Sequence, residues 1–359
     1  MIKLKGPISI ADYMADALGH PHDGYYNSAT SIGADGDFTT APEISQIFGE
    51  LIGAWLVQSW ITMGEPTNFN LVELGPGRGV LMADILRTAQ IRPAFAKAVD
   101  VWLLEASGRL RHEQQKRLRG FDTRMHWADQ FDDIPDAPTL IIANEFFDCL
   151  PIRQFQRTGT TWRERLIGLN PHNDGLDFVL AQTPAAPDLP IPAHLTKKAD
   201  QKEGPQDGDI FEFSEDAQQF MKKINKLIRD NGGRALIIDY GHLASGLGDT
   251  FQAVKAHRYC PPLSTPGKAD VTAHVDFDAL ARIALEDGMQ VDGPVTQGSF
   301  LERLGLPLRV DALSKSASEK TAQTIHAGAH RISSPAQMGE IFKVLCVGSP
   351  NLSAPPGFS

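Results

Sequence analysis

Three glycines at alternate positions, Gly75, Gly77 and Gly79, give this sequence its clearest chemical signal. They follow a short apolar run and precede a stretch with helical periodicity, so the backbone is expected to turn tightly and to meet a ligand near the positive end of a helix dipole. The acidic Glu73, two residues before the first glycine, favours a cationic ligand over a pyrophosphate. Because Val80 stands where a dinucleotide fingerprint requires its third glycine, a nicotinamide site is disfavoured. A glycine-rich turn without a ligand is the alternative.

Further polar residues stand at the predicted carboxyl ends of other strands. Glu105 closes the next strand, and a carboxylate there can accept two hydrogen bonds from ribose hydroxyls in the crevice of an open sheet. A surface acid at a strand end is the alternative for this residue. Asp129, after the third strand, is a candidate for contact with an adenine amino group, although a solvated turn explains it nearly as well.

Two acids follow the fourth predicted strand, which ends at Asn144 and Glu145. Glu145 and Asp148 are three residues apart, so they share a face if the segment is helical. Two carboxylates in the crevice can grip a cationic side chain and accept a proton from it. A helix N-cap with a solvated first turn is the alternative, chiefly for Asp148.

The elements that must position these residues alternate between short apolar segments and helix-length amphipathic stretches, which is the pattern of a doubly wound α/β sheet. Helices are predicted over residues 80–97 and 107–119. The predicted strands are Asn70–Leu74, Val101–Glu105, Met125–Ala128, Thr139–Ala143 and Ala235–Tyr240.

Other regions depart from this alternation. Residues 151–210 are predicted to be an insertion, because alternating segments typical of antiparallel strands lead into a proline-rich polar loop. Apolar residues over 44–56 predict a strongly amphipathic helix, and Thr40 and Glu43 have the spacing of a capping box. The predicted organisation is an N-terminal helical lid over 1–66, a catalytic domain over 67–150 and 211–349, the insertion over 151–210, and a flexible tail over 350–359.

Composition narrows the function classes. The 359 residues include 34 Lys and Arg against 44 Asp and Glu, and a net charge of −10 argues against a nucleic-acid partner, which requires clustered basic residues. The three cysteines, Cys149, Cys260 and Cys346, lie too far apart for a metal-ligand motif or a disulfide framework. No apolar run approaches the length of a membrane span, and the first residues resemble neither a secretory nor an organelle leader. We therefore expect a cytoplasmic protein with no membrane insertion and no bound metal.

Several motifs together resemble the MidA family of S-adenosylmethionine-dependent methyltransferases. The resemblance extends from about His20 to Leu306. It is carried by Gly36–Ser45 (GDFTTAPEIS), Glu73–Gly79 (ELGPGRG), Ala143–Pro151 (ANEFFDCLP), Asp239–His242 (DYGH) and Lys268–Asp276 (KADVTAHVD). The family is related to a mitochondrial factor that methylates an arginine of a respiratory complex I subunit during assembly.

The resemblance implies a Rossmann-like class I methyltransferase: a seven-stranded, mostly parallel sheet with the last strand antiparallel, whose sixth and seventh strands would fall within residues 250–300. It implies S-adenosyl-L-methionine as cofactor and an arginine of a protein, a complex I subunit or its bacterial relative, as acceptor. Glu145 is then the first candidate for gripping the acceptor and Asp148 the second. Cofactor binding is assigned to Thr39, Thr40, Glu73, Gly75, Gly77, Gly79, Glu105, Asp129 and Asn144.

Two sets of alternatives stay open, one for the Thr39–Glu43 segment and one for the acceptor. The segment from Thr39 to Glu43 explains the start of a helix, yet its free backbone N–H groups could equally meet the methionine carboxylate of the cofactor. Because a fold does not fix its acceptor, a small-molecule methyltransferase and a non-catalytic complex-assembly factor remain alternatives to protein-arginine methylation.

Overall fold

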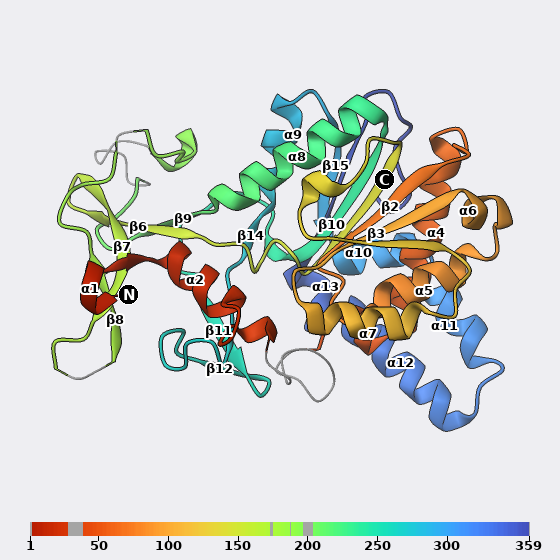
Figure 1. The fold of residues 1–359 in the computed structure, drawn as a ribbon, viewed down its shortest axis with the longest axis horizontal. Helices are drawn as coiled ribbons and strands as arrows, with labels where there is room; N and C mark the ends of the chain where they lie inside the picture. Colours follow the sequence, from red (N-terminus) through yellow and green to blue (C-terminus); the bar gives the residue numbers. More distant parts are fainter. Residues whose placement is uncertain (1, 28–38, 173–174, 187, 197–203, 359) are drawn as a thin grey trace.

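The largest element is a twisted sheet at one end of an elongated molecule (Figure 1). The computed structural model describes residues 2–27, 39–172, 175–186, 188–196 and 204–358. In order across the sheet, the strands are β15 (Gln290–Thr296), β16 (Phe342–Gly348), β10 (Gly233–His242), β5 (Thr139–Asn144), β2 (Phe69–Leu74), β3 (Val99–Leu104) and β4 (Arg124–Ala128). The short β14 (Val275–Asp276) pairs in parallel with Gly241 and His242 at the end of β10.

The pairing confirms the predicted class I fold. β16 runs antiparallel to both β10 and β15, whereas β10, β5, β2, β3 and β4 pair in parallel. The prediction for the last strand was wrong in its position: the seventh strand is residues 342–348, beyond the predicted 250–300. A group of helices lies between the sixth and seventh strands, namely α10 (Gln297–Arg303), α11 (Leu306–Ser314), α12 (Glu319–Ser333) and α13 (Met338–Ile341).

Alternate residues of the strands bury two separate hydrophobic clusters, as expected for a sheet covered on both faces. Leu71 and Leu140 face one cluster, and their neighbours Val72 and Ile141 face the other. The helices on the Leu71 side are α4 (Gln46–Thr62), α5 (Val80–Ala89), α6 (Pro93–Ala98), α7 (Gly108–Leu118) and, from the group before β16, α10, α11 and α12. The helices on the Val72 side are α8 (Glu215–Asn231) and α9 (Phe277–Glu286). The predicted helix over 80–97 is thus two helices, and Pro93 occupies the first turn of the second.

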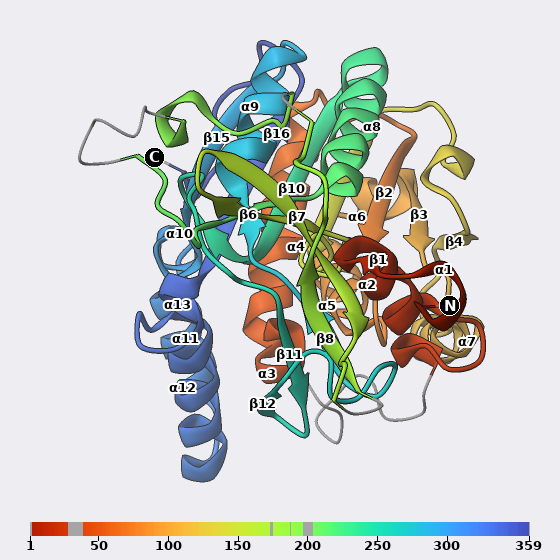
Figure 2. The ribbon, with the colours of Figure 1, turned by 90° about the vertical axis from the view of Figure 1, so that its left-hand side faces the viewer.

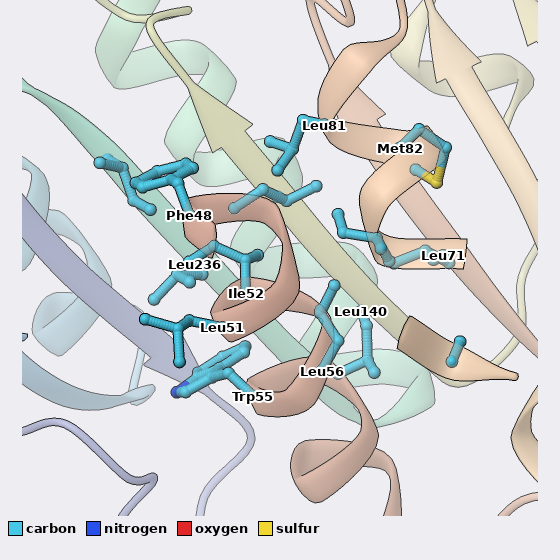
Figure 3. Close-up of a cluster of buried hydrophobic side chains, with 14 of the residues drawn as sticks. Phe48, Leu51, Ile52, Trp55, Leu56, Leu71, Leu81, Met82, Leu140 and Leu236 are labelled. Carbon is cyan, nitrogen blue, oxygen red and sulfur yellow. The ribbon is translucent and has the colours of Figure 1, made fainter. Parts of the chain in front are cut away.

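The helix before the sheet is buried on every side except a narrow stripe at Gln46, Ala54 and Gln58, so it is less amphipathic than predicted. Figure 3 shows its Phe48 and Ile52 among side chains of the sheet and of α5. On another side, Gly49 and Gly53 let α5 approach closely: a Cβ on Gly49 would lie 2.5 Å from the Cβ of Asp84. A helix enclosed on several sides has apolar and small residues on most of its faces.

A second body of antiparallel strands stands at the other end of the molecule (Figures 1 and 2). It joins β1 (Ile8–Ser9) to the strands of the predicted insertion, namely β6 (Arg153–Thr158), β7 (Thr161–Leu169), β8 (Leu176–Leu180) and β9 (Ile210–Phe213). Two short N-terminal helices pack there, α1 (Ile2–Lys5) and α2 (Ile10–Gly19). A small sheet completes this body with β11 (Gln252–Lys255), β12 (Arg258–Cys260) and β13 (Asp270–Thr272). The predicted domain boundaries remain a prediction. In the segment predicted to be a flexible tail, the Pro356 carbonyl accepts a 3.1 Å hydrogen bond from the Trp55 indole of α4.

Candidate active site

A cavity of about 320 Å³ opens at the carboxyl ends of β2, β3 and β5, where open α/β sheets bind their ligands. Nine of the residues proposed from the sequence line it: Thr40, Glu73, Gly75, Gly77, Glu105, Asp129, Asn144, Glu145 and Asp148. Thr39 and Gly79 are not among the lining residues. We call the part around Glu73, Gly75, Gly77 and Glu105 the glycine-loop end, and the part around Glu145, Asp148 and Asp270 the acid end.

All three glycines of the loop have left-handed backbone conformations. The φ angles of Gly75, Gly77 and Gly79 are 62°, 51° and 73°. A Cβ on Gly75 would also lie 3.1 Å from the ring of Phe146, which lines the same cavity. Gly79 is the N-cap of α5. The loop therefore requires glycine for the left-handed conformations of its turn and, at Gly75, for the close approach to Phe146.

Glu73 is buried at the end of β2 and faces the cavity. Its Oε2 has no hydrogen-bond partner within the described part of the chain. Burial, and secondly the nearby Glu105, raise the pKa of Glu73 to about 8. A buried carboxyl group with an unused oxygen is suited to a ligand that brings positive charge or N–H and O–H donors.

Glu105, by contrast, has partners for both of its oxygens. Its Oε1 accepts from the backbone N–H of Ser107 over 2.8 Å, and its Oε2 accepts from the side-chain amide of Gln114 over 3.2 Å. Burial raises the pKa of Glu105, and the hydrogen bond from Ser107 opposes that rise. Since each carboxylate oxygen can accept a second hydrogen bond, Glu105 keeps capacity for a ligand.

The Asp129 carboxylate lies at the rim of the cavity and is 74% exposed. Its Oδ1 accepts a 2.6 Å hydrogen bond from the Arg111 guanidinium, which also donates to the backbone of Glu105 and Ala128. The structure thus brings Asp129 to the cavity as an ion-paired residue, and its contact with adenine stays a prediction.

Glu145 occupies the first position beyond β5 in a left-handed conformation with φ of 52°, which is uncommon for a residue other than glycine. Its Oε1 accepts from the Ala41 backbone N–H over 3.3 Å and from the Asn144 amide over 3.2 Å. Neither its Oε2 nor the Asn144 Oδ1 has a hydrogen-bond partner among the described residues. Burial, and secondly Asp148, raise the pKa of Glu145 to about 8.

Asp148 and Asp270 complete the acid end. Asp148 is buried, which raises its pKa to about 6, while a hydrogen bond from the Tyr240 hydroxyl opposes that rise. Asp270, from β13, lines the same cavity and is close enough to raise the pKa of Glu145 further. Asp270 belongs to the Lys268–Asp276 motif but had no predicted role, because its strand belongs to a different sheet and no local pattern places it beside β5.

The segment after Glu145 is held by Asp239, the first residue of the Asp239–His242 motif, which also had no predicted role. Asp239 Oδ2 accepts hydrogen bonds from the backbone N–H groups of Phe146, Phe147 and Asp148 at 3.2, 3.0 and 3.2 Å. Asp239 Oδ1 accepts from the N–H of Tyr240. An acid within the apolar run of β10 was the available signal, since a buried charge requires such partners.

The predicted capping box at Thr40 and Glu43 was wrong. Thr40 is the N-cap of α3 (Ala41–Ile44) but makes no side-chain cap hydrogen bond. Glu43 instead pairs with Arg78 of the glycine loop, 3.7 Å away. The segment therefore contributes to the cavity wall, and the Ala41 N–H is used by Glu145. Residues 36–38 of the motif lie outside the described residues.

Parallel-sheet topology, glycines at the first strand end and acids at the next strand ends define a nucleotide-type cofactor site of the class I methyltransferase kind. The residues fit S-adenosylmethionine, because the oxygens without partners on Glu73 and Asn144 match a cofactor that carries an amine, hydroxyl groups and a sulfonium. Comparison with known proteins then places the chain: it belongs to a family of S-adenosyl-L-methionine-dependent methyltransferases, whose model matches residues 51–295, which confirms the MidA-like resemblance.

Relatives and a solved structure agree with this assignment. The chain is 38% identical to the Danio rerio protein arginine methyltransferase NDUFAF7, mitochondrial, over 95% of this chain and 83% of that one. It is 37% identical to the Homo sapiens protein of the same name, over 95% and 80%. A Burkholderia thailandensis protein bound to S-adenosyl-homocysteine has the same fold, with a TM-score of 0.79, 24% identity, and coverage of 99% and 91%. The protein is therefore an S-adenosylmethionine-dependent methyltransferase.

Two further observations concern regions away from this cavity. No described helix combines the length and the apolar character that a bilayer span requires. His242 lines a separate cavity of about 290 Å³ together with Phe211 and Phe213.

Proposed function

We propose that this methyltransferase acts on an arginine side chain of a protein. The observation that carries the proposal is the acid end, where Glu145, Asp148 and Asp270 converge on one part of the cavity and Glu145 presents an oxygen with no partner among the described residues. A guanidinium matches such a site because it is a planar cation with several N–H donors. The NDUFAF7 relatives are named protein arginine methyltransferases, which supports the same acceptor.

Glu145 has the geometry of the acceptor-gripping residue. Its Oε1 is fixed by Ala41 and Asn144, so the carboxylate plane is set before the acceptor binds. A pKa of about 8 leaves the carboxyl group largely protonated at neutral pH, and an arriving cation lowers that pKa and ionises it. Acceptor binding and loss of the Glu145 proton are therefore linked.

A protonated guanidinium has no free lone pair on nitrogen, so methylation requires that one proton leave. S-adenosylmethionine, when bound, supplies an electrophilic methyl group on a sulfonium. Glu145 Oε2 accepts the departing proton, and Asp148 stabilises the positive charge that stays on the guanidinium. Glu73, Asn144, Glu105 and the loop glycines hold the cofactor.

We propose a relative of a respiratory complex I subunit as the acceptor protein, on the basis of the resemblance to the MidA family. The test is to incubate the purified enzyme and labelled S-adenosylmethionine with extract from cells that lack the enzyme, and then to hydrolyse the labelled fraction. We expect label in methylarginine, on one protein whose mass rises by one or two methyl groups. Label in a small soluble product, or in another amino acid, would contradict the proposal.

The matched variants are Glu145→Gln and Glu302→Gln, the latter an exposed acid on α10. We expect Glu145→Gln to reduce methyl transfer by roughly 10²–10⁴-fold, the range of a lost proton acceptor, while calorimetry shows nearly unchanged cofactor affinity. Glu302→Gln should match the wild type in both assays. Normal turnover in Glu145→Gln would remove this residue from the proposed role.

A cytoplasmic location is part of the same proposal. The three cysteines are free, which suits a reducing compartment. The NDUFAF7 relatives are named mitochondrial, so the compartment needs its own test. Fractionation of the native host followed by immunodetection should find the protein with cytoplasmic markers, and recovery with an organelle or the membrane would contradict that expectation.

A further inference from the structure

Gln114 is a fully buried polar residue on α7, behind the glycine-loop end of the cavity. Its side-chain amide makes three hydrogen bonds to three separate parts of the fold. Nε2 donates to the Gly77 carbonyl over 2.7 Å and to Glu105 Oε2 over 3.2 Å. Oε1 accepts from the Trp127 indole N–H over 2.8 Å. One amide thus connects the loop after β2, the acid after β3 and a residue of β4.

The chemistry of these partners fixes which way the amide points. An indole N–H can only donate, so the oxygen of Gln114 must face Trp127. The two N–H groups then face the Gly77 carbonyl and the Glu105 carboxylate, which can only accept while the carboxylate is ionised. A flipped amide would set an N–H against an N–H and an oxygen against two acceptors. Trp127 therefore determines the direction in which Gln114 donates.

Gln114 is one of two donors that hold the Glu105 carboxylate: the Ser107 N–H donates to Oε1, and the Gln114 amide donates to Oε2. Each oxygen retains a second lone pair for the cavity that Glu105 lines. We propose that Gln114 is a positioning residue for the cofactor: through Glu105 and the Gly77 carbonyl it presets the surface that receives the ribose of S-adenosylmethionine. Presetting these acceptors spares the binding step the ordering of a mobile carboxylate.

The first test compares Gln114→Glu with Gln115→Glu, since Gln115 is the exposed neighbour on the same helix. A carboxylate at 114 meets the Gly77 carbonyl and the Glu105 carboxylate with an acceptor in place of a donor. We expect Gln114→Glu to raise the calorimetric Kd for S-adenosyl-homocysteine by roughly 10–100-fold at pH 8, the effect of turning a donor into a buried repulsive acceptor. The loss should shrink as the pH falls towards 5.5, because a protonated carboxyl can donate again.

A merely structural role would lower the stability of Gln114→Glu but leave the Kd of the folded protein for S-adenosyl-homocysteine unchanged. If Gln114→Glu shows the same Kd as Gln115→Glu across this pH range, or a loss that is constant with pH, the proposal is wrong.

A second test removes the group that orients the amide, in case substitution at 114 prevents folding. Trp127 is partly exposed, so Trp127→Phe keeps most of the packing while deleting the N–H. We expect a several-fold rise in the Kd for S-adenosyl-homocysteine, and a smaller rise for an analogue that lacks the ribose hydroxyls. An equal rise for both ligands, or no rise for either, would show that the network does not act through the ribose.

Discussion

The two ends of the cavity use acidic residues in opposite ways. At the glycine-loop end, Glu105 has hydrogen-bond donors behind both oxygens, so its carboxylate is set as an acceptor before any ligand binds. At the acid end, Glu145 and Asp148 are buried beside one another and beside Asp270, and burial raises the pKa values of Glu145 and Asp148. One end is prepared to accept hydrogen bonds, and the other is prepared to change its protonation.

This difference shows how one cavity can serve two partners. A cofactor that must bind and leave in every cycle is served by fixed acceptors with little cost of ordering. An acceptor side chain that must lose a proton is served by carboxyl groups whose charge state depends on what lies next to them. Glu73 is intermediate, since it lies at the glycine-loop end but is desolvated like the acids of the other end.

The largest loss of cofactor affinity is expected from a substitution in the glycine loop. Gly77→Val places a β-branched residue at a φ of 51° beside the cavity, and we expect cofactor affinity to fall by more than roughly 100-fold. Gly64→Val is the matched control, because Gly64 has a φ of 87° in an open turn far from the site, with nothing within 4 Å of an added Cβ. Calorimetry should separate the two variants. Equal affinities would show that the loop does not contact the cofactor.

The conformation of the acid end depends on Asp239, which accepts hydrogen bonds from the backbone after Glu145. In Asp239→Asn one oxygen becomes an NH₂ group that faces a backbone N–H, and we expect the free energy of unfolding in urea to fall by about 1–3 kcal/mol. Methyl transfer should fall more than cofactor affinity does, since the anchored segment from Phe146 to Asp148 directly follows Glu145 and carries Asp148. Asp122→Asn, at an exposed position, is the control. A variant with wild-type unfolding and turnover would exclude an anchoring role.

The parts of the fold and the site that could be predicted from the sequence are those set by local patterns. The strands, Gly75, Glu105 and Glu145 follow from local patterns, because a strand end in a parallel sheet places its next residues at the ligand-binding edge. The seventh strand was misplaced because four helices separate it from the sixth, and no local sequence pattern indicates how many helices lie between two strands. The helix over residues 46–62 was misjudged because its burial depends on elements that pack on it from several sides.

Residues that act from behind the cavity were missed for a related reason. Gln114 follows Leu110 and precedes Leu118 at four-residue spacing, so a polar residue in the buried stripe of α7 was visible in the sequence. Its partners are 37 residues before it and 13 after it along the chain, however, and only the folded sheet joins them. Asp270 comes from another sheet altogether. Local patterns identify which strand ends carry chemistry, and the supporting residues require the three-dimensional structure.

Replacement of Glu73, the desolvated acid at the glycine-loop end, should raise the stability of the ligand-free protein and weaken cofactor binding. Its pKa of about 8 in the folded state exceeds the ordinary 4.5, so the folded state binds more protons than the unfolded chain between these values. Stability from this group is therefore present below pH 4.5 and is lost as pH rises towards 8. We expect Glu73→Gln to stabilise the ligand-free protein at pH 8 by roughly 1–3 kcal/mol, to change little at pH 4.5, and to weaken cofactor binding. Thermal melts at both pH values measure this; equal shifts at both would contradict the assigned cause.

The smallest expected effect concerns the coupling between the two acids. The kcat/KM for methyl transfer should rise with pH around a midpoint near 8, because Glu145 of the acceptor-free enzyme must be ionised before it can accept the proton. In Asp148→Asn the neighbouring negative charge is gone, so the pKa of Glu145 falls and the rising limb moves to lower pH by about one unit. Asp129→Asn, at the exposed rim of the glycine-loop end, should leave the midpoint in place. If both variants keep the wild-type midpoint while Asp148→Asn loses only rate, Asp148 grips the acceptor without tuning Glu145, and the two acids act independently.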